Sequence, residues 1–379
     1  MTSNLILSLP NHYISAVMKE INKVGDCINL GQGNPDLDTP SFITNALTSA
    51  VQSEQFSGYP SFYGDDRLKE EIINLYNSKY NVFLTKEEVA IVPGGKTALS
   101  LVASSILNYG DSVILSDPYY PDMLSILKAL NNEISYITLR EENFYLPRFE
   151  ELSLDVYDKA KLIYLNYPNN PTGAIANDSV FNESISLALK HKLYILHDFA
   201  YGEITFEQEE PKSYLSYENA IDVGVELYSF SKAYNMAGMR IASIVGNKAI
   251  VFNVEKLLSH FFTGIYGAVQ MAAIEAIKNG NEYKKTLSNI YLKRRDIFLK
   301  YIDKKNVFVP KSTFYCWVKI PERFANSFEF FRHLLYSKKV AVFPGEGFGK
   351  QGSRHVRVSL LDNEKNIEIA AKRIQECYR

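Results

Sequence analysis

The sequence predicts an α/β protein with a large, mostly parallel central sheet and a second, smaller α/β unit. Short apolar runs alternate with longer amphipathic stretches from about residue 40 to 275, which is typical of strands and helices that alternate around a parallel sheet. The chain has 379 residues, 46% of them hydrophobic, so it can bury a large core and form two domains. Polar and glycine-containing segments directly follow the apolar runs. They would therefore lie at the carboxyl ends of the strands, where parallel sheets bind ligands.

The elements of the large unit follow from this alternation. Strands are expected where four to six mainly apolar residues follow one another: 89–92, 112–115, 134–138, 162–165, 193–196, 223–228 and 241–245. Helices are expected in the amphipathic stretches between them, for example at 66–79, 97–108, 120–130 and 177–191. Each strand should therefore be joined to the next through a helix.

The smaller unit has its own pattern. Strands are expected at 315–318 and 340–343. We predict an N-terminal arm at 1–30 that joins the small domain, a large domain at 31–280 and a small C-terminal domain at 281–379.

Composition and charge exclude several classes of protein. The net charge of −2 gives no electrostatic case for binding nucleic acid or an anionic membrane surface. The three cysteines have no CxxC spacing, and the six histidines form no ligand spacing, so neither a disulfide framework nor a metal site is expected. No apolar run is long enough to span a bilayer and no signal-peptide pattern is present, so we expect a cytoplasmic protein.

Lys232 lies in the most informative segment of the chain. It follows the apolar stretch 223–228, is preceded by the hydroxyls of Ser229 and Ser231, and is followed eight residues later by Arg240. A lysine amine becomes a nucleophile when its surroundings lower its pKa or hold an aldehyde against it. A lysine taken alone is more often an ordinary surface residue, so the interpretation depends on matching parts elsewhere.

Those parts match the requirements of pyridoxal phosphate. Lys232 supplies an amine for the aldehyde, and Asp198 is the candidate partner of the ring nitrogen, which must stay protonated for the ring to act as an electron sink. Tyr201 and Asn170 can donate to the ring hydroxyl, and Tyr120 can stack on the ring. Each has a structural alternative: Asp198 as a helix N-cap, Asn170 as a turn residue, and Tyr120 as a core aromatic.

A phosphate site is also predicted. Gly94, Gly95 and Lys96 come between a strand and a helix, where free backbone N–H groups and the helix dipole favour an anion. Ser229 and Arg240 would complete the cradle, the arginine through charge-assisted hydrogen bonds.

Four segments together resemble one family. They are Gly31–Asp36, Asn169–Gly173, Asp198–Tyr201 and Ser229 through Arg240. In order and approximate spacing they are similar to the class I/II aminotransferases, pyridoxal-phosphate enzymes of fold type I. The stretches Asn166–Pro168, His197–Gly202 and Tyr234–Gly238 most resemble bacterial methionine-salvage/glutamine transaminases. The likeness covers nearly the whole chain.

The resemblance implies roles for three further residues. Arg357 would clamp the substrate α-carboxylate together with Asn170, a task suited to guanidinium, although taken alone it is more simply a solvated strand residue. Gly33 would bring its backbone close to the substrate, although it is also a plain turn glycine. Tyr59 would reach the phosphate of a neighbouring subunit, which implies a homodimer with shared active sites.

The implied activity is transfer of an amino group between an amino acid and a 2-oxo acid by a ping-pong mechanism. Relatives specific for dicarboxylates carry an arginine in the segment that is Leu258–Phe262 here, which has none. An apolar, sulfur-containing or aromatic substrate side chain, with a glutamine- or glutamate-type donor, is therefore expected. Alternatives are a C–S lyase on the same fold, an alanine or LL-diaminopimelate aminotransferase, and a non-catalytic ligand-sensing domain of a transcription regulator.

Overall fold

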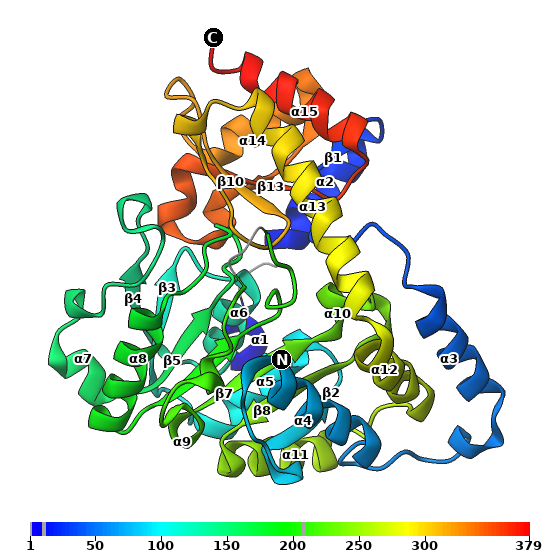
Figure 1. Ribbon diagram of the computed structural model, residues 1–379. Helices are drawn as coiled ribbons and strands as arrows, with labels where there is room; N and C mark the ends of the chain where they lie inside the picture. Colours follow the sequence, from blue (N-terminus) through cyan, green and yellow to red (C-terminus); the bar gives the residue numbers. More distant parts are fainter. Residues whose placement is uncertain (1, 10–12, 207–209) are drawn as a thin grey trace.

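The computed structural model describes residues 2–9, 13–206 and 210–379. Figure 1 shows a larger lower part built around one broad sheet and a smaller upper part that carries the C-terminus. Helix α13 (Asn281–Tyr301) runs from the lower part into the upper one.

The large sheet has seven strands in the order β2-β8-β7-β6-β5-β3-β4. All are parallel to one another except β8, which is antiparallel to both of its neighbours. The strands are β2 (Val89–Val92), β3 (Ser112–Asp117), β4 (Glu133–Thr138), β5 (Ala160–Asn166), β6 (Tyr194–Asp198), β7 (Gly224–Ser229) and β8 (Ala242–Gly246). They are nearly continuous apolar runs because both faces of the sheet are covered.

Helices cover the two faces of this sheet. One face packs against α5 (Gly95–Ile106), α6 (Pro121–Ala129) and α11 (Lys248–Phe261). The other packs mainly against α4 (Asp66–Tyr80), α8 (Asp178–His191) and α12 (Gly267–Asn279), with α3 (Ser41–Gln52) against α12. Short helices at the rim are α7 (Leu154–Lys159), α9 (Ala220–Val223) and α10 (Phe230–Ala233).

The boundaries of several helices follow from capping. The Asn177 side chain accepts a hydrogen bond from the Val180 N–H at the start of α8, and Asn247 does the same for α11. Helix α5 starts after Gly94, whose φ of 86° falls in the left-handed region that glycine tolerates.

The upper part is built on a four-stranded antiparallel sheet in the order β12-β13-β10-β9. Its strands are β9 (Val307–Phe308), β10 (Tyr315–Lys319), β12 (Phe343–Pro344) and β13 (His355–Ser359). A separate parallel pair joins β1 (Ile28–Asn29) to β11 (Val340–Ala341). The helices of this part are α2 (Tyr13–Val24), α14 (Ser327–Lys338) and α15 (Glu364–Glu376), whereas α1 (Asn4–Ser8) contacts α6 of the lower part.

The expected fold class is confirmed: the chain is α/β with a mostly parallel central sheet. The expected strand at 340–343 is wrong in detail. Two short strands, β11 and β12, take its place and pair in different sheets, because Val340 and Ala341 hydrogen-bond to the N-terminal strand β1 while Phe343 pairs with Arg357.

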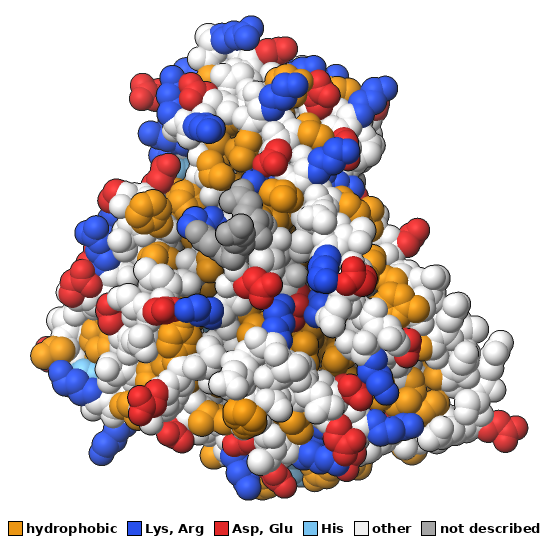
Figure 2. Space-filling view, in the orientation of Figure 1, with side chains coloured by type: hydrophobic (Ala, Val, Ile, Leu, Met, Phe, Trp, Pro, Cys, Tyr) orange, Lys and Arg blue, Asp and Glu red, His pale blue; other side chains and the backbone are white. Residues whose placement is uncertain are grey.

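The surface carries charges of both signs. On the face drawn in Figure 2, basic and acidic side chains are interspersed, and neither sign covers a large continuous area. No helix among the described residues is long and apolar enough to cross a membrane.

Candidate active site

The register of three central strands brings the predicted site residues together. Asn166 at the end of β5 lies beside Asp198 at the end of β6, and Asp198 lies beside Leu227 of β7. Ser229 ends β7, and Lys232 lies in the short helix α10 that follows it. Because these strands are parallel, their carboxyl ends meet at one edge of the sheet.

A cavity of about 450 Å³ opens at this edge. Ten of the predicted residues line it: Gly33, Gly95, Lys96, Tyr120, Asn170, Asp198, Tyr201, Ser229, Lys232 and Arg240. The amine of Lys232 and the carboxyl of Asp198 therefore face one cavity, as a single bound ring requires.

Lys232 has the properties of a nucleophilic amine. Its Nζ donates to the carbonyl oxygen of Gly33 over 2.7 Å. Burial, followed by the positive charges of Arg357 and Arg240, lowers the pKa of Lys232 to about 7. A large fraction of the amine is therefore uncharged near neutral pH, which is the form that attacks an aldehyde.

Asp198 lies under the cavity as a buried acid. Burial raises its pKa, and the opposing contributions come first from the Tyr164 hydroxyl, which donates to Oδ2 over 2.8 Å, and then from the Ala200 N–H, which donates to Oδ1. This buried carboxyl group can pair with a protonated ring nitrogen. Tyr164 was not among the predicted residues.

Arg240 lies beside the start of α5, where the phosphate cradle is predicted. A Cβ added at Gly94 would collide with the Arg240 guanidinium, so a side chain at this position would displace the arginine from the start of α5. The Ser229 hydroxyl accepts the Ser231 N–H at the start of α10. The Lys96 side chain forms an ion pair with Asp122 over 2.9 Å. An anion here would therefore be bound mainly by the backbone N–H groups at the start of α5, rather than by the Lys96 amine.

Tyr120 is held in place beside the cavity. It lies at the start of α6, and its hydroxyl donates to Asp122 Oδ2 over 2.7 Å. Asp122 therefore links Tyr120 to Lys96, which makes it a second residue that the sequence did not point to. The sequence hardly indicated a role for Asp122, because an acidic residue is common in the first turn of a helix.

Arg357 lines an adjoining cavity of about 370 Å³. The two cavities adjoin, because both are lined by Lys232, Gly33, Tyr120, Asn170 and Tyr201. The arginine donates through Nη1 to Asn170 Oδ1 over 3.1 Å and through Nη2 to the Gly31 carbonyl oxygen over 3.2 Å. Its Nε is buried and has no hydrogen-bond partner among the described residues.

Tyr315 also belongs to this site and was not predicted. Its ring lies under the Arg357 guanidinium, with 4.2 Å from Cζ to the ring centroid, and its hydroxyl accepts a hydrogen bond from the Tyr201 hydroxyl over 3.1 Å. A Cβ added at Gly33 would collide with the Tyr315 hydroxyl, so the close approach of these two segments requires a glycine.

Two predicted site residues, Gly94 and Tyr59, line neither cavity; Gly94 directly precedes the lining residue Gly95, whereas Tyr59 lies on the surface. The Tyr59 side chain is 92% exposed in the single chain. The prediction that it reaches the site of a second subunit is not tested by one chain. No group of three or more His, Cys, Asp or Glu side chains in the described ranges is placed to hold a metal ion.

These residues fit pyridoxal phosphate. One cavity brings together an amine with a lowered pKa, a buried acid, an aromatic residue and a helix start beside an arginine. The adjoining cavity ends at a buried guanidinium suited to a carboxylate.

Comparisons with known proteins agree with this arrangement. The family model for aminotransferase class I and II matches residues 25–374. Transaminase BacF of Bacillus subtilis is 42% identical, with 99% of this chain and 96% of the relative covered. Its substrate-bound structure has a TM-score of 0.95 at 40% identity and covers 100% of this chain and 98% of that one.

Two further relatives carry more specific names. The L-glutamine--4-(methylsulfanyl)-2-oxobutanoate aminotransferase of Bacillus subtilis is 35% identical and covers 98% of this chain and 95% of the relative. An LL-diaminopimelate aminotransferase of Nitratidesulfovibrio vulgaris is 37% identical and covers 95% of this chain and 94% of that protein.

Proposed function

This chain belongs to the class I and II aminotransferases, and we propose that it exchanges amino groups between a glutamine- or glutamate-type donor and a 2-oxo acid with an apolar, sulfur-containing or aromatic side chain. The family depends on pyridoxal phosphate. When bound, this cofactor supplies an aldehyde for the amino group and an electron sink that stabilises negative charge at the substrate α-carbon.

The observation that carries the proposal is that Lys232 and Arg357 line the same cavity, next to the one that Asp198 lines. Arg357 can bind the substrate α-carboxylate through its two Nη atoms, with Asn170 beside it. The carboxylate then fixes the α-carbon near Lys232, whose amine is available as a base for the α-proton because of its lowered pKa. Asp198 holds the proton of the ring nitrogen.

The lining of the second cavity supports the choice of substrate. Among the described residues that line it, Lys232 and Arg357 are the only cations. A distal carboxylate, on the acceptor or on a glutamate donor, would therefore find no further charged partner among the described residues that line this cavity. Ile14 and Met18 offer apolar contacts, and the side chains of Asn22 and Gln32 can hydrogen-bond a neutral amide, as a glutamine-type donor requires.

A substrate panel tests this proposal. Glutamine, glutamate, methionine and alanine would be offered as donors to a series of 2-oxo acids, and kcat/KM measured for each pair. We expect apolar, sulfur-containing or aromatic 2-oxo acids to exceed oxaloacetate at least tenfold. A preference for oxaloacetate, or release of pyruvate and ammonia from cystathionine without any acceptor, would overturn it. Lys232→Ala should abolish both turnover and the visible absorption band that arises from the imine link between this lysine and the cofactor.

We also propose a cytoplasmic homodimer in which each subunit completes the other's site. The exposed Tyr59 supports this, as do the exposed aromatic residues Phe62, Tyr63, Phe261 and Phe262. The segments 59–63 and 261–264 lie side by side, because Gly264 packs against Ser61. Mixing Lys232→Ala with Tyr59→Ala subunits tests it: a shared site predicts activity above that of either variant alone, through mixed dimers with one intact site.

A further inference from the structure

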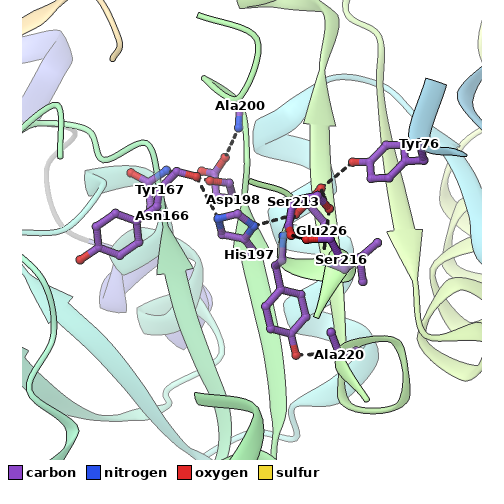
Figure 3. A network of polar contacts seen from close by, with 12 residues as sticks. Tyr76, Asn166, Tyr167, His197, Asp198, Ala200, Ser213, Ser216, Ala220 and Glu226 are labelled. Carbon is purple, nitrogen blue, oxygen red and sulfur yellow. Dashed lines mark hydrogen bonds and ion pairs between the residues drawn. The ribbon is translucent and has the colours of Figure 1, made fainter. Parts of the chain in front are cut away.

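A buried acid–base pair lies directly behind Asp198. His197 of β6 and Glu226 of β7 are register partners in the parallel sheet, and both are 0% exposed. Figure 3 shows the His197 ring between the Asp198 segment and Glu226, with dashed contacts on both sides of the ring. Neither residue lines the cavities of the site, and the proposed reaction assigns neither of them a role.

The hydrogen bonds define how many protons the His197 ring carries. Its Nδ1 lies 2.8 Å from Glu226 Oε2, and its Nε2 lies 2.8 Å from the Tyr167 carbonyl oxygen. A carbonyl oxygen can only accept, so Nε2 must donate. If Glu226 is a carboxylate, Nδ1 must donate as well, and the ring is then an imidazolium.

The surroundings of Glu226 favour the carboxylate. The hydroxyls of Tyr76 and Ser213 donate to its Oε1 over 2.7 and 2.9 Å, and the Tyr214 N–H donates to Oε2 over 2.8 Å. With His197, four donors converge on this one side chain. Hydrogen bonds to the charged form of a carboxyl group stabilise that form.

Among the groups that face His197, Glu226 is the main counterion for a positively charged ring. Aromatic rings of Phe181, Phe199 and Tyr214 pack against the imidazole. Burial, and then Glu226, raise the pKa values of Tyr76 and Tyr214 far above their usual range, so both remain neutral phenols. The titratable partners that can carry charge are therefore Glu226, which balances the imidazolium, and Asp198, the next residue of the strand.

The position of His197 also couples three segments of the site. Its Nε2–H holds the Tyr167 carbonyl oxygen in the loop that leads to Asn170. The same loop is tied to Asp198, because Asn166 donates to the Asp198 carbonyl oxygen and accepts the Asn170 N–H. Through Glu226 the ring is tied to β7, the strand that ends just before Lys232.

We propose that His197 is a positively charged positioning residue: with Glu226 as counterion, it keeps Asp198 in the carboxylate form and fixes the loop that carries Asn170. Burial raises the Asp198 pKa, and the charge of His197 opposes that rise. This inference rests on the proposed role of Asp198 and is independent of which donor and acceptor the enzyme uses.

The first test is the proton count on the ring in the full-length protein. The chain has only six histidines, so nitrogen-15 labelling of histidine gives a sparse spectrum, and loss of one set of signals in His197→Gln assigns it. We expect protons on both ring nitrogens of His197 at neutral pH, with and without cofactor. A single protonated nitrogen in the wild type would overturn the proposal, and this measurement needs no substrate.

The second test removes the charge and keeps the shape. In Glu226→Gln a neutral His197 can still donate to Tyr167 and accept from the new amide NH2, although this NH2 can no longer accept the Tyr214 N–H that Oε2 accepts in the wild type. Without the neighbouring positive charge, Asp198 should protonate more easily. The acidic limb of the bound cofactor's absorbance titration, and that of kcat/KM, should then move to higher pH by about one unit, the order expected when one nearby opposite charge is lost.

Tyr76→Phe is the matched control. It removes one hydrogen bond from the same carboxylate but leaves both charges in place. If the pair acts through charge, only Glu226→Gln shifts the acidic limb. Equal shifts in both variants, or no shift in Glu226→Gln, would mean that the pair is only structural and would overturn the proposal. If Glu226→Gln does not fold, the wild-type ring spectrum still decides.

Discussion

The lowered pKa of Lys232 predicts how the cofactor-free protein responds to replacing this residue. Lys232→Met keeps the length of the side chain and removes the amine. In the wild type, burial first, and then the charges of Arg357 and Arg240, lower the pKa from 10.5 to about 7. The folded state therefore holds a proton on this amine less tightly than the unfolded chain does, which costs stability wherever the unfolded chain is protonated.

The size and pH window of this cost follow from the shift. For an amine fully shielded from solvent, this pKa shift lowers the free energy of unfolding by about 4 kcal/mol at pH 7 and by about 1.5 kcal/mol at pH 9.5. Lys232 is only half-buried, so solvent screening reduces the change between these two pH values to about 1 to 2 kcal/mol. The cost is largest below pH 7 and disappears as the pH rises through 10.5, so the wild type gains stability with pH and the variant does not.

Urea unfolding of both cofactor-free proteins at pH 7 and pH 9.5 measures this change. The variant also loses the hydrogen bond from Nζ to Gly33, but that loss is nearly the same at both pH values and cancels in the comparison. The same substitution at Lys161, which is exposed on β5, controls for the change in net charge. A stability difference between Lys232→Met and wild type that stays constant or grows with pH would refute the reasoning.

Three further predictions concern single contacts. Arg357→Lys replaces a two-pronged donor by a point charge, so KM for the amino donor should rise at least about tenfold, with a smaller change in kcat, in steady-state assays. Gly33→Ala should lower kcat/KM because the new Cβ collides with the Tyr315 hydroxyl; adding Tyr315→Phe should restore part of it, and no rescue would contradict the collision. Burial would raise the Glu203 pKa, but Lys284 and Lys79 lower it to about 2. Glu203→Gln should therefore cost about 3 kcal/mol in urea unfolding above pH 4.5, and the difference from wild type should vanish as the pH falls towards 2.

The central strands and the residues that follow them could be predicted because two local signals coincide there. Apolar runs such as Val89–Val92 are buried on both faces, and the polar residues directly after each run reach the sheet edge. The apolar run and the polar residues after it are adjacent in the sequence, so both can be recognised from a short segment. The prediction of the fold and of the shared cavity of Lys232 and Asp198 needed no knowledge of how distant segments pack.

The missed residues depend on register and on distant packing. Tyr164 reaches Asp198 because β5 and β6 pair with Asn166 opposite Asp198, which places Tyr164 one diagonal step away on the same face. Tyr315 enters the site because β10 of the small sheet lies beside the segment that follows β6, which places the Tyr315 hydroxyl against Tyr201. The split of 340–343 has the same origin, since the partner of β11 is a strand more than 300 residues earlier in the chain. The amphipathic pattern of one segment contains none of this information.

The alternation of faces along β6 links the chemistry of this enzyme to its core. Asp198 turns towards the cavity and His197, its neighbour, turns into the interior on the opposite face of the sheet. Inserting or deleting one residue in this strand would exchange the two, because side chains in a strand alternate with a period of two. The carboxylate would then be buried among aromatic rings and the imidazole would enter the cavity. Natural variation in length should therefore be confined to the loops between strands, and a transplant of this site to another scaffold must carry its buried partners with it.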